Sequence, residues 1–79
     1  MVTRQRLQRE FGDVLREHRT ASGLTQEKLA HKAGITTAFV GQLERGKKSP
    51  SLWTIARLSR VLGVPMKDLV GAAEARSGT

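Results

Sequence analysis

Hydrophobic residues recur along most of this chain at steps of three and four, the period of an α-helix with one buried face. The first stretch, residues 5–22, carries Leu7, Phe11 and Leu15 at steps of four and stops before Gly23. Glycine readily adopts the left-handed backbone conformation that ends helices. No stretch shows the sustained alternation that is typical of a β-strand, so the pattern predicts an all-α protein that opens with a helix over residues 5–22.

Capping residues and helix-ending glycines divide the rest of the chain into four more predicted helices. Thr25, Thr36 and Ser51 each stand directly before a helical stretch, where a side-chain oxygen can accept a hydrogen bond from the first turn. The four helices are expected over residues 26–33, 37–45, 52–62 and 65–70. Residues 71–79 are small and polar and are expected to form a flexible C-terminal tail. The chain is therefore predicted to hold one domain over residues 1–70.

The composition fits one small domain with a strong excess of positive charge. The chain has 79 residues, of which 38% are hydrophobic, enough for one compact core. Its 14 Lys and Arg residues against 7 Asp and Glu residues give a formal net charge of +7. This excess of positive charge favours an anionic partner. Three kinds of partner are open: a nucleic acid, an anionic membrane surface and an acidic protein. Composition alone does not choose among the three.

The residue types needed for several other functions are missing or scattered. The chain has no cysteine, and its two histidines, His18 and His31, stand apart without a clustered carboxylate, so we expect no metal site and no cofactor. No nucleophile stands beside a recognisable base and no glycine-rich loop could cradle a phosphate, which argues against catalytic residues and an enzyme. No apolar run approaches the ~20 residues of a membrane span. Met1–Glu10 does not resemble a secretory signal, so we expect no membrane partner and a cytoplasmic location.

Residues 26–45 combine two short helices and a glycine-containing turn, the arrangement of a helix-turn-helix. The second of these helices keeps one face free of core residues. That face holds Thr37, Ala38, Gly41 and Gln42, with Arg45 below them. A face of short side chains can enter the major groove of DNA, where a glutamine can pair with adenine, and Gly41 leaves room for a close approach of the backbone.

The same region resembles the Cro/cI-type helix-turn-helix regulators, also called the xenobiotic-response-element family. The resemblance runs in register from Phe11 to Val70 and rests on Leu24-Thr25-Gln26, Leu29-Ala30, Gly34, Val40, Leu43-Glu44-Arg45-Gly46, Pro50-Ser51-Leu52 and Leu62-Gly63-Val64. It implies a compact five-helix lambda-repressor-like DNA-binding domain whose second and third helices form the helix-turn-helix. It also implies a homodimer that binds a near-palindromic operator in double-stranded DNA and regulates transcription, for example as a repressor on the nucleoid.

By this resemblance, three residues read bases and five bind phosphates. The base-reading positions are Thr37, Ala38 and Gln42, and the phosphate-binding positions are Gln26, Thr36, Arg45, Lys47 and Lys48. A helix N-terminus favours an anion, which agrees with a phosphate at Gln26. Arg19 and Glu44 fall where the family forms a largely buried ion pair, which is interpreted as structural.

Trp53 is an aromatic residue at a position of the fourth helix that is usually polar in the family. Three interpretations stay open for it: a packed helix residue, a dimer contact or a residue near the DNA backbone. Exposed aromatic residues are enriched at interfaces, so Trp53 is a candidate for the dimer interface, together with Met66 and Val70.

The rival function is a protein-interaction module, such as an antitoxin, with a second regulatory protein as its partner. The few residues after Gly71 would have to supply any segment that wraps such a partner, which favours the regulator. No small-molecule ligand is expected. The basic residues Arg4, Arg6 and Arg9 near the N-terminus are interpreted as a solvated helix face.

Overall fold

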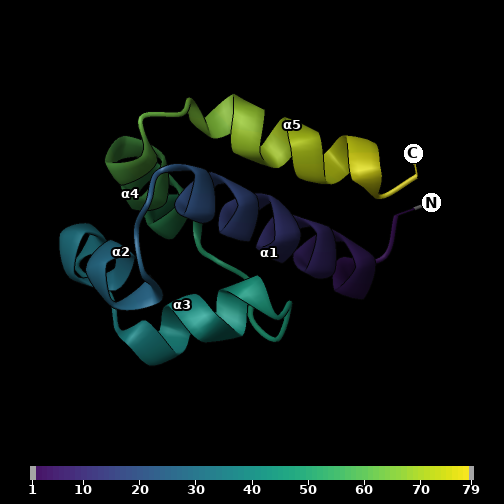
Figure 1. Ribbon diagram of the computed structural model, residues 1–79. Coiled ribbons are helices and arrows are strands. Elements are labelled where there is room, and N and C mark those ends of the chain that lie inside the picture. The colour runs from purple at the N-terminus through teal and green to yellow at the C-terminus, as the bar shows by residue number, and fades with distance from the viewer. Residues whose placement is uncertain (1, 79) are drawn as a thin grey trace.

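The computed structural model describes residues 2–78, which form five helices and no strand (Figure 1). The helices are α1 (Arg4–Ala21), α2 (Gln26–Ala33), α3 (Thr37–Glu44), α4 (Leu52–Leu62) and α5 (Met66–Arg76). The predicted all-α fold is confirmed, and the ends of the first four helices differ from the predicted ones by at most one residue. Over the described part of the chain, no helix has the length and apolar character needed to cross a membrane.

The predicted helix caps are present. The side-chain oxygens of Thr25, Thr36 and Ser51 accept hydrogen bonds of 3.0–3.1 Å from backbone N–H groups three residues further on. Each bond satisfies one of the N–H groups that the first turn of a helix leaves without a partner inside the helix. At the other end of α2, Gly34 has a φ of 72°, a left-handed conformation that L side chains rarely adopt. These local signals explain why the helix ends could be predicted.

The predicted fifth helix is too short, and the prediction of a flexible tail is wrong for the helical residues after Val70. α5 continues to Arg76, because the residues at 72–76 are good helix formers and contacts with α1 and the core add to this preference. Ala73 is buried, and the hydroxyl of Ser77 donates a hydrogen bond of 2.7 Å to its carbonyl oxygen. Arg76 also donates hydrogen bonds of 2.7 and 2.8 Å to the carboxylate of Glu17 on α1. The predicted tail residue Thr79 lies outside the described residues.

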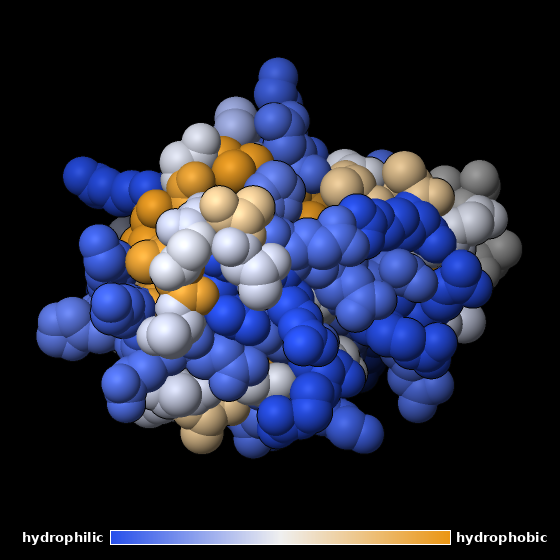
Figure 2. All heavy atoms as spheres, viewed as in Figure 1, coloured by the Kyte–Doolittle hydropathy of each residue, from blue (hydrophilic) through white to orange (hydrophobic). Residues whose placement is uncertain are grey.

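α1 is the central helix of the fold. Figure 1 shows α5 along one side of α1 and α3 along the other, while α2 and α4 lie together at one end of the molecule. The buried residues of the hydrophobic core come from all five helices: Phe11, Val14, Leu15, Leu29, Ala30, Ala33, Val40, Leu43, Leu58, Leu69 and Ala73. In the view of Figure 2, the surface over α1 is mostly hydrophilic, whereas hydrophobic side chains gather at the end where α2 and α4 lie.

The predicted apolar stripe of α1 is right for Phe11 and Leu15 but wrong for Leu7, which remains 36% exposed. Leu7 lies near the start of α1 and lines a hollow of about 160 Å³ between α1, α4 and α5, so it meets the core only at its edge. Val14, which the predicted stripe did not include, is buried. The buried face of α1 is therefore set by what covers the helix as well as by its own period.

Gly12 is the point at which α3 is placed against α1. A Cβ atom added at Gly12 would lie 2.7 Å from the carbonyl oxygen of Glu44, and the carbonyl oxygen of Leu43 is also in contact. Real Cβ atoms do not approach other atoms so closely, so only glycine allows the two helix backbones to meet here. The C-terminal end of α3 therefore rests directly on the backbone of α1.

Candidate nucleic-acid interface

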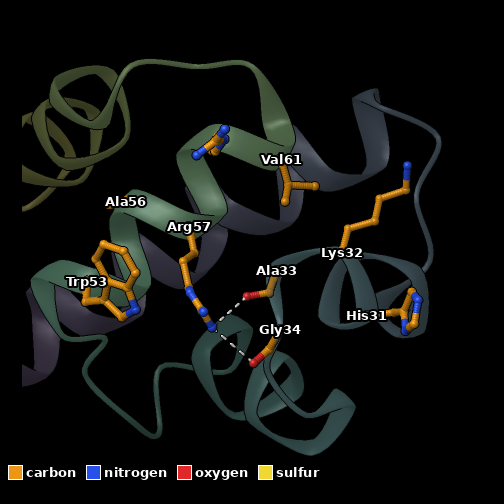
Figure 3. A pocket seen from close by; sticks show the side chains of 9 residues that line it. His31, Lys32, Ala33, Gly34, Trp53, Ala56, Arg57 and Val61 are labelled. Carbon is orange, nitrogen blue, oxygen red and sulfur yellow. Dashed lines mark hydrogen bonds between the residues drawn. The ribbon is translucent and has the colours of Figure 1, made fainter.

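Arg57 of α4 forms hydrogen bonds with the turn between α2 and α3. Its guanidinium Nη1 donates hydrogen bonds of 3.2 Å to the carbonyl oxygen of Ala33 and 3.3 Å to that of Gly34 (Figure 3). A cation is favourable there because the last carbonyl groups of a helix lack partners inside the helix and carry partial negative charge. The ring of Trp53 lies over the guanidinium, with 5.4 Å between Cζ and the ring centre. The turn that leads into α3 is thus held from α4.

A second set of contacts holds the other end of α3. Nε and Nη2 of Arg19 donate hydrogen bonds of 2.6 and 3.1 Å to the carboxylate of Glu44. The predicted ion pair between these two residues is therefore formed. Only 12% of the Arg19 side chain and 4% of the Glu44 side chain are exposed. The hydrogen bonds that Arg19 donates to the Glu44 carboxylate raise the pKa of Arg19 above its usual value. Gln26 Nε2 donates a further hydrogen bond of 2.9 Å to the same carboxylate, so α1, α2 and α3 meet at Glu44.

Gln26 and Thr36 stand at the N-terminal ends of the two helices of the motif. Gln26 is the first residue of α2 and is half-buried, with one amide hydrogen committed to Glu44. Thr36 precedes α3 and is exposed, and its hydroxyl oxygen accepts the capping hydrogen bond of 3.0 Å from the backbone N–H of Phe39. The second amide hydrogen of Gln26 and the hydroxyl hydrogen of Thr36 are the remaining donors of these two side chains.

The outer face of α3 carries the predicted base-reading residues. Thr37 and Ala38 are exposed and Gln42 is half-buried. Gly41 on this face is buried, and the end of the exposed Arg45 side chain lies over it. A Cβ atom added at Gly41 would lie 3.1 Å from Nη1 of Arg45, so the glycine makes room for a guanidinium of the same helix end.

The basic loop after α3 is held in place by a residue that the sequence did not reveal. Gln8 of α1 donates from Nε2 to the carbonyl oxygen of Gly46 at 3.3 Å and accepts a hydrogen bond of 2.6 Å from the hydroxyl of Ser49. Between these two bonds lie Lys47 and Lys48, both exposed. Gln8 stands about 40 positions away in the chain, so no local pattern could have identified it.

The candidate dimer residues do not form one cluster. Trp53 is 68% exposed and lines a hollow of about 370 Å³ between α2 and α4 (Figure 3). Val70 lines the separate hollow between α1, α4 and α5, which also contains Ile55 of α4. Trp53 and Ile55 are two positions apart on α4, which places them on nearly opposite sides of the helix. Met66 is half-buried at the start of α5.

Comparison with known proteins identifies the family of this chain. The model of the helix-turn-helix family HTH_3 matches residues 15–69. An uncharacterized HTH-type transcriptional regulator of Methanothermobacter thermautotrophicus is 48% identical over 50 residues, which cover 63% of this chain and 72% of that protein. Control protein C.BamHI of Bacillus amyloliquefaciens is 38% identical over 61 residues, 76% of this chain and 75% of that protein.

A solved structure agrees with the sequence relatives. The restriction-modification controller protein C.AhdI of Aeromonas hydrophila superposes with a TM-score of 0.76 and 43% identity, over 77% of this chain and 92% of that one. Among the curated relatives the matched part spans from 46% to 79% of the relative's own length. The chain belongs to the Cro/C1-type helix-turn-helix family of transcriptional regulators, which are DNA-binding proteins rather than enzymes.

Proposed function

We propose that this protein is a sequence-specific regulator of transcription that binds a near-palindromic operator as a homodimer. The observation that carries the proposal is the outer face of α3, which presents short polar side chains and is followed at once by an exposed basic loop. In this proposal α3 enters the major groove of double-stranded DNA, and two copies of α3 lie in successive grooves about 34 Å apart. The protein then acts in the cytoplasm by occupying its operator, which blocks or recruits polymerase.

Different residues supply the specificity and the affinity in this proposal. Thr37, Ala38 and Gln42 contact base edges, since Gln can pair with adenine through a donor and an acceptor and Ala can meet the methyl group of thymine. The remaining residues contact the DNA backbone, where charge and hydrogen-bond donors are needed but no sequence is read. These residues are Gln26, Thr36, Arg45, Lys47 and Lys48.

The dimer contact is best assigned to the apolar face that includes Val70. Leu7 and Val70 are both partly exposed beside the hollow between α1, α4 and α5. Leu52 is 74% exposed and stands three residues before Ile55, on the same side of α4. A second copy would cover these apolar side chains, whereas Trp53 already has a partner in its own chain. Val70→Glu should therefore convert a dimer to a monomer in sedimentation equilibrium, and Trp53→Ala should leave the dimer intact.

In vitro selection from a random double-stranded library tests the proposed function. An enriched motif with two-fold symmetry, bound in the presence of competitor DNA at about 150 mM salt, is the expected result. Binding without enrichment that fades as the salt concentration rises would contradict it, because charge alone produces such binding.

Two variants then test the assignment of roles. Gln42→Ala should weaken binding to the selected operator by ~1–3 kcal/mol and relax the preference at one base position. Lys48→Ala should weaken binding to operator and random DNA alike and flatten the salt dependence. If Gln42→Ala, like Lys48→Ala, weakens binding to operator and random DNA by the same factor, α3 does not read bases in the way proposed.

A further inference from the structure

A basic hollow of about 420 Å³ lies between the start of α1 and the loop that follows α3. It is lined by Gln5, Gln8, Arg9, Arg45, Gly46 and Lys47. Three of these side chains are cations, two are amides that can donate hydrogen bonds, and none is an acid. The lining therefore holds three cationic residues and no acidic residue to balance them, which favours an anion there.

Arg9 is the one arginine of the N-terminal run that faces this hollow. Arg6 is engaged elsewhere, because its guanidinium bonds to the carboxylate of Glu10 at 3.2 Å and to the carbonyl oxygen of Arg76 at 3.1 Å. Arg4 lines the apolar hollow beside α5. Arg9 is exposed and forms no ion pair within residues 2–78. The interpretation of all three arginines as one solvated face is therefore too coarse, since they point to three different surroundings.

The backbone fixes Arg9 beside the basic loop. A Cβ atom added at Gly46 would lie 2.8 Å from Cα of Arg9, so the loop backbone touches the backbone of α1 at this residue. Gln8, the neighbour of Arg9, holds both sides of the loop through its bonds to Gly46 and Ser49. Arg9 and Lys47 are thus kept on one surface by contacts that do not involve their own charged groups.

We propose that the Arg9 hollow binds a phosphate group of the DNA backbone next to the phosphates held by the loop, so that α1 is a further anchor on the operator. This inference rests on the proposed function, because it needs α3 and the loop to lie on DNA. A phosphate fits the lining because a guanidinium can donate two parallel hydrogen bonds to its oxygens while lysine and glutamine donate to the others. The contact reads no base and should act equally on every sequence.

The test compares Arg9→Gln with Lys67→Gln, which removes the same charge from α5, on the side of α1 away from α3 (Figure 1). Each phosphate contact contributes about 0.9 to the slope of log affinity against log salt on B-DNA. Arg9→Gln should lower this slope by about 0.9, which makes its loss of affinity about 3.5-fold larger at 50 mM than at 200 mM salt. The loss should be the same on operator and random DNA. Lys67→Gln should keep the slope of the natural chain.

Two further variants separate the side chain from the structure of the helix. Arg9→Lys keeps a cation and should keep the slope. Gln5→Glu places a carboxylate one helical turn from Arg9, so it should lower the slope while leaving the guanidinium in place. Circular dichroism melts show whether each variant is folded. If folded Arg9→Gln and Lys67→Gln have the same slope while the natural chain still selects its operator, the inference is wrong and the proposed function stands.

Inorganic phosphate distinguishes a free anion from a DNA phosphate as the source of the ligand. Replacing chloride by phosphate at equal sodium concentration should leave the DNA affinity of the natural chain unchanged, because a lone phosphate lacks the other backbone contacts. Competition by phosphate in the natural chain that disappears in Arg9→Gln would show a site for the free anion instead. If the natural chain selects no operator at all, the proposed function itself fails.

Discussion

Replacing Glu44 by alanine should cost this small domain much of its stability. The change removes a carboxylate that accepts two hydrogen bonds from Arg19 and one from Gln26. Arg19 keeps its charge, because a guanidinium does not lose its proton in proteins. Among residues 2–78 the one acceptor left to its side chain is the backbone carbonyl of Leu24, at 2.9 Å. The variant therefore holds a nearly buried cation without its counter-charge.

The size of the effect follows from the burial of the pair. Removing one partner of a buried ion pair costs about 3–5 kcal/mol. Since 12% of the Arg19 side chain is exposed, water can reach the stranded cation, and we expect a value near the lower end of that range. A chain of 79 residues has a total stability of about 4–12 kcal/mol. Glu44→Ala should therefore remain folded at ambient temperature with about 1–9 kcal/mol of stability left.

Urea unfolding followed by circular dichroism measures this loss. The shift in midpoint can be converted to free energy if the slope of stability against urea concentration is unchanged. Glu17→Ala is the matched control, since it removes a carboxylate from an ion pair whose acidic side chain is 59% exposed, and it should shift the midpoint far less. The double variant Arg19→Met with Glu44→Leu replaces both partners by apolar side chains and should recover most of the loss.

Two results would refute this reasoning. A loss below ~0.5 kcal/mol for Glu44→Ala would place the residue among ordinary surface positions. A double variant as unstable as the sum of Arg19→Met and Glu44→Leu alone would show that the two side chains act independently, because only coupled residues depart from additivity.

Three further predictions concern stability. Gly12→Ala should destabilise the fold by ~1–3 kcal/mol or more in urea unfolding, because the added Cβ atom meets carbonyl oxygens of α3. In Gly71→Ala the added Cβ atom meets nothing within 4 Å, so this control should stabilise the fold by ~0.4–1 kcal/mol. Similar effects at both sites would contradict the close packing at Gly12. The hydrogen bond from Arg76 lowers the pKa of Glu17 below its ordinary 4.5, so the pair contributes stability above that pH and loses it as pH falls through the folded pKa. Glu17→Gln should therefore lower the urea midpoint near pH 7 and do so less and less as the pH falls below 4.5, and an equal shift at every pH would exclude the carboxylate as the cause. Thr36→Ala should cost ~1 kcal/mol by removing a helix cap, and an unchanged thermal midpoint would show that the cap is dispensable.

The sequence predicts those parts of the fold that depend on neighbouring residues. The caps at Thr25, Thr36 and Ser51 and the end of α2 at Gly34 are local, so short patterns reveal them. The second half of α5 is different, because Gly71 suggests a helix end although the residues at 72–76 are good helix formers. That half is held by Ala73 in the core and by contacts with α1, which no local pattern contains.

The site divides in the same way. The exposed residues of α3 follow from helical spacing, whereas the contacts that position α3 join distant parts of the chain. Gln8 reaches the basic loop, and Arg57 reaches the turn before α3 from a position 23 residues later. Glutamine and arginine are common on protein surfaces, so their residue types alone did not mark them as structural. Gly12 offered one signal, because a glycine inside a helix often marks a close contact.

The stacking of Trp53 on Arg57 gives the protein an intrinsic optical probe. Trp53 is the one tryptophan of the chain, so its fluorescence is free of overlapping emission from other indoles. Its ring contacts the guanidinium that binds the carbonyl oxygens of the α2–α3 turn. Loosening of this turn would release the guanidinium and change the surroundings of the indole. The emission of unlabelled protein can therefore follow the packing of the helix-turn-helix against α4 from a residue outside the recognition helix.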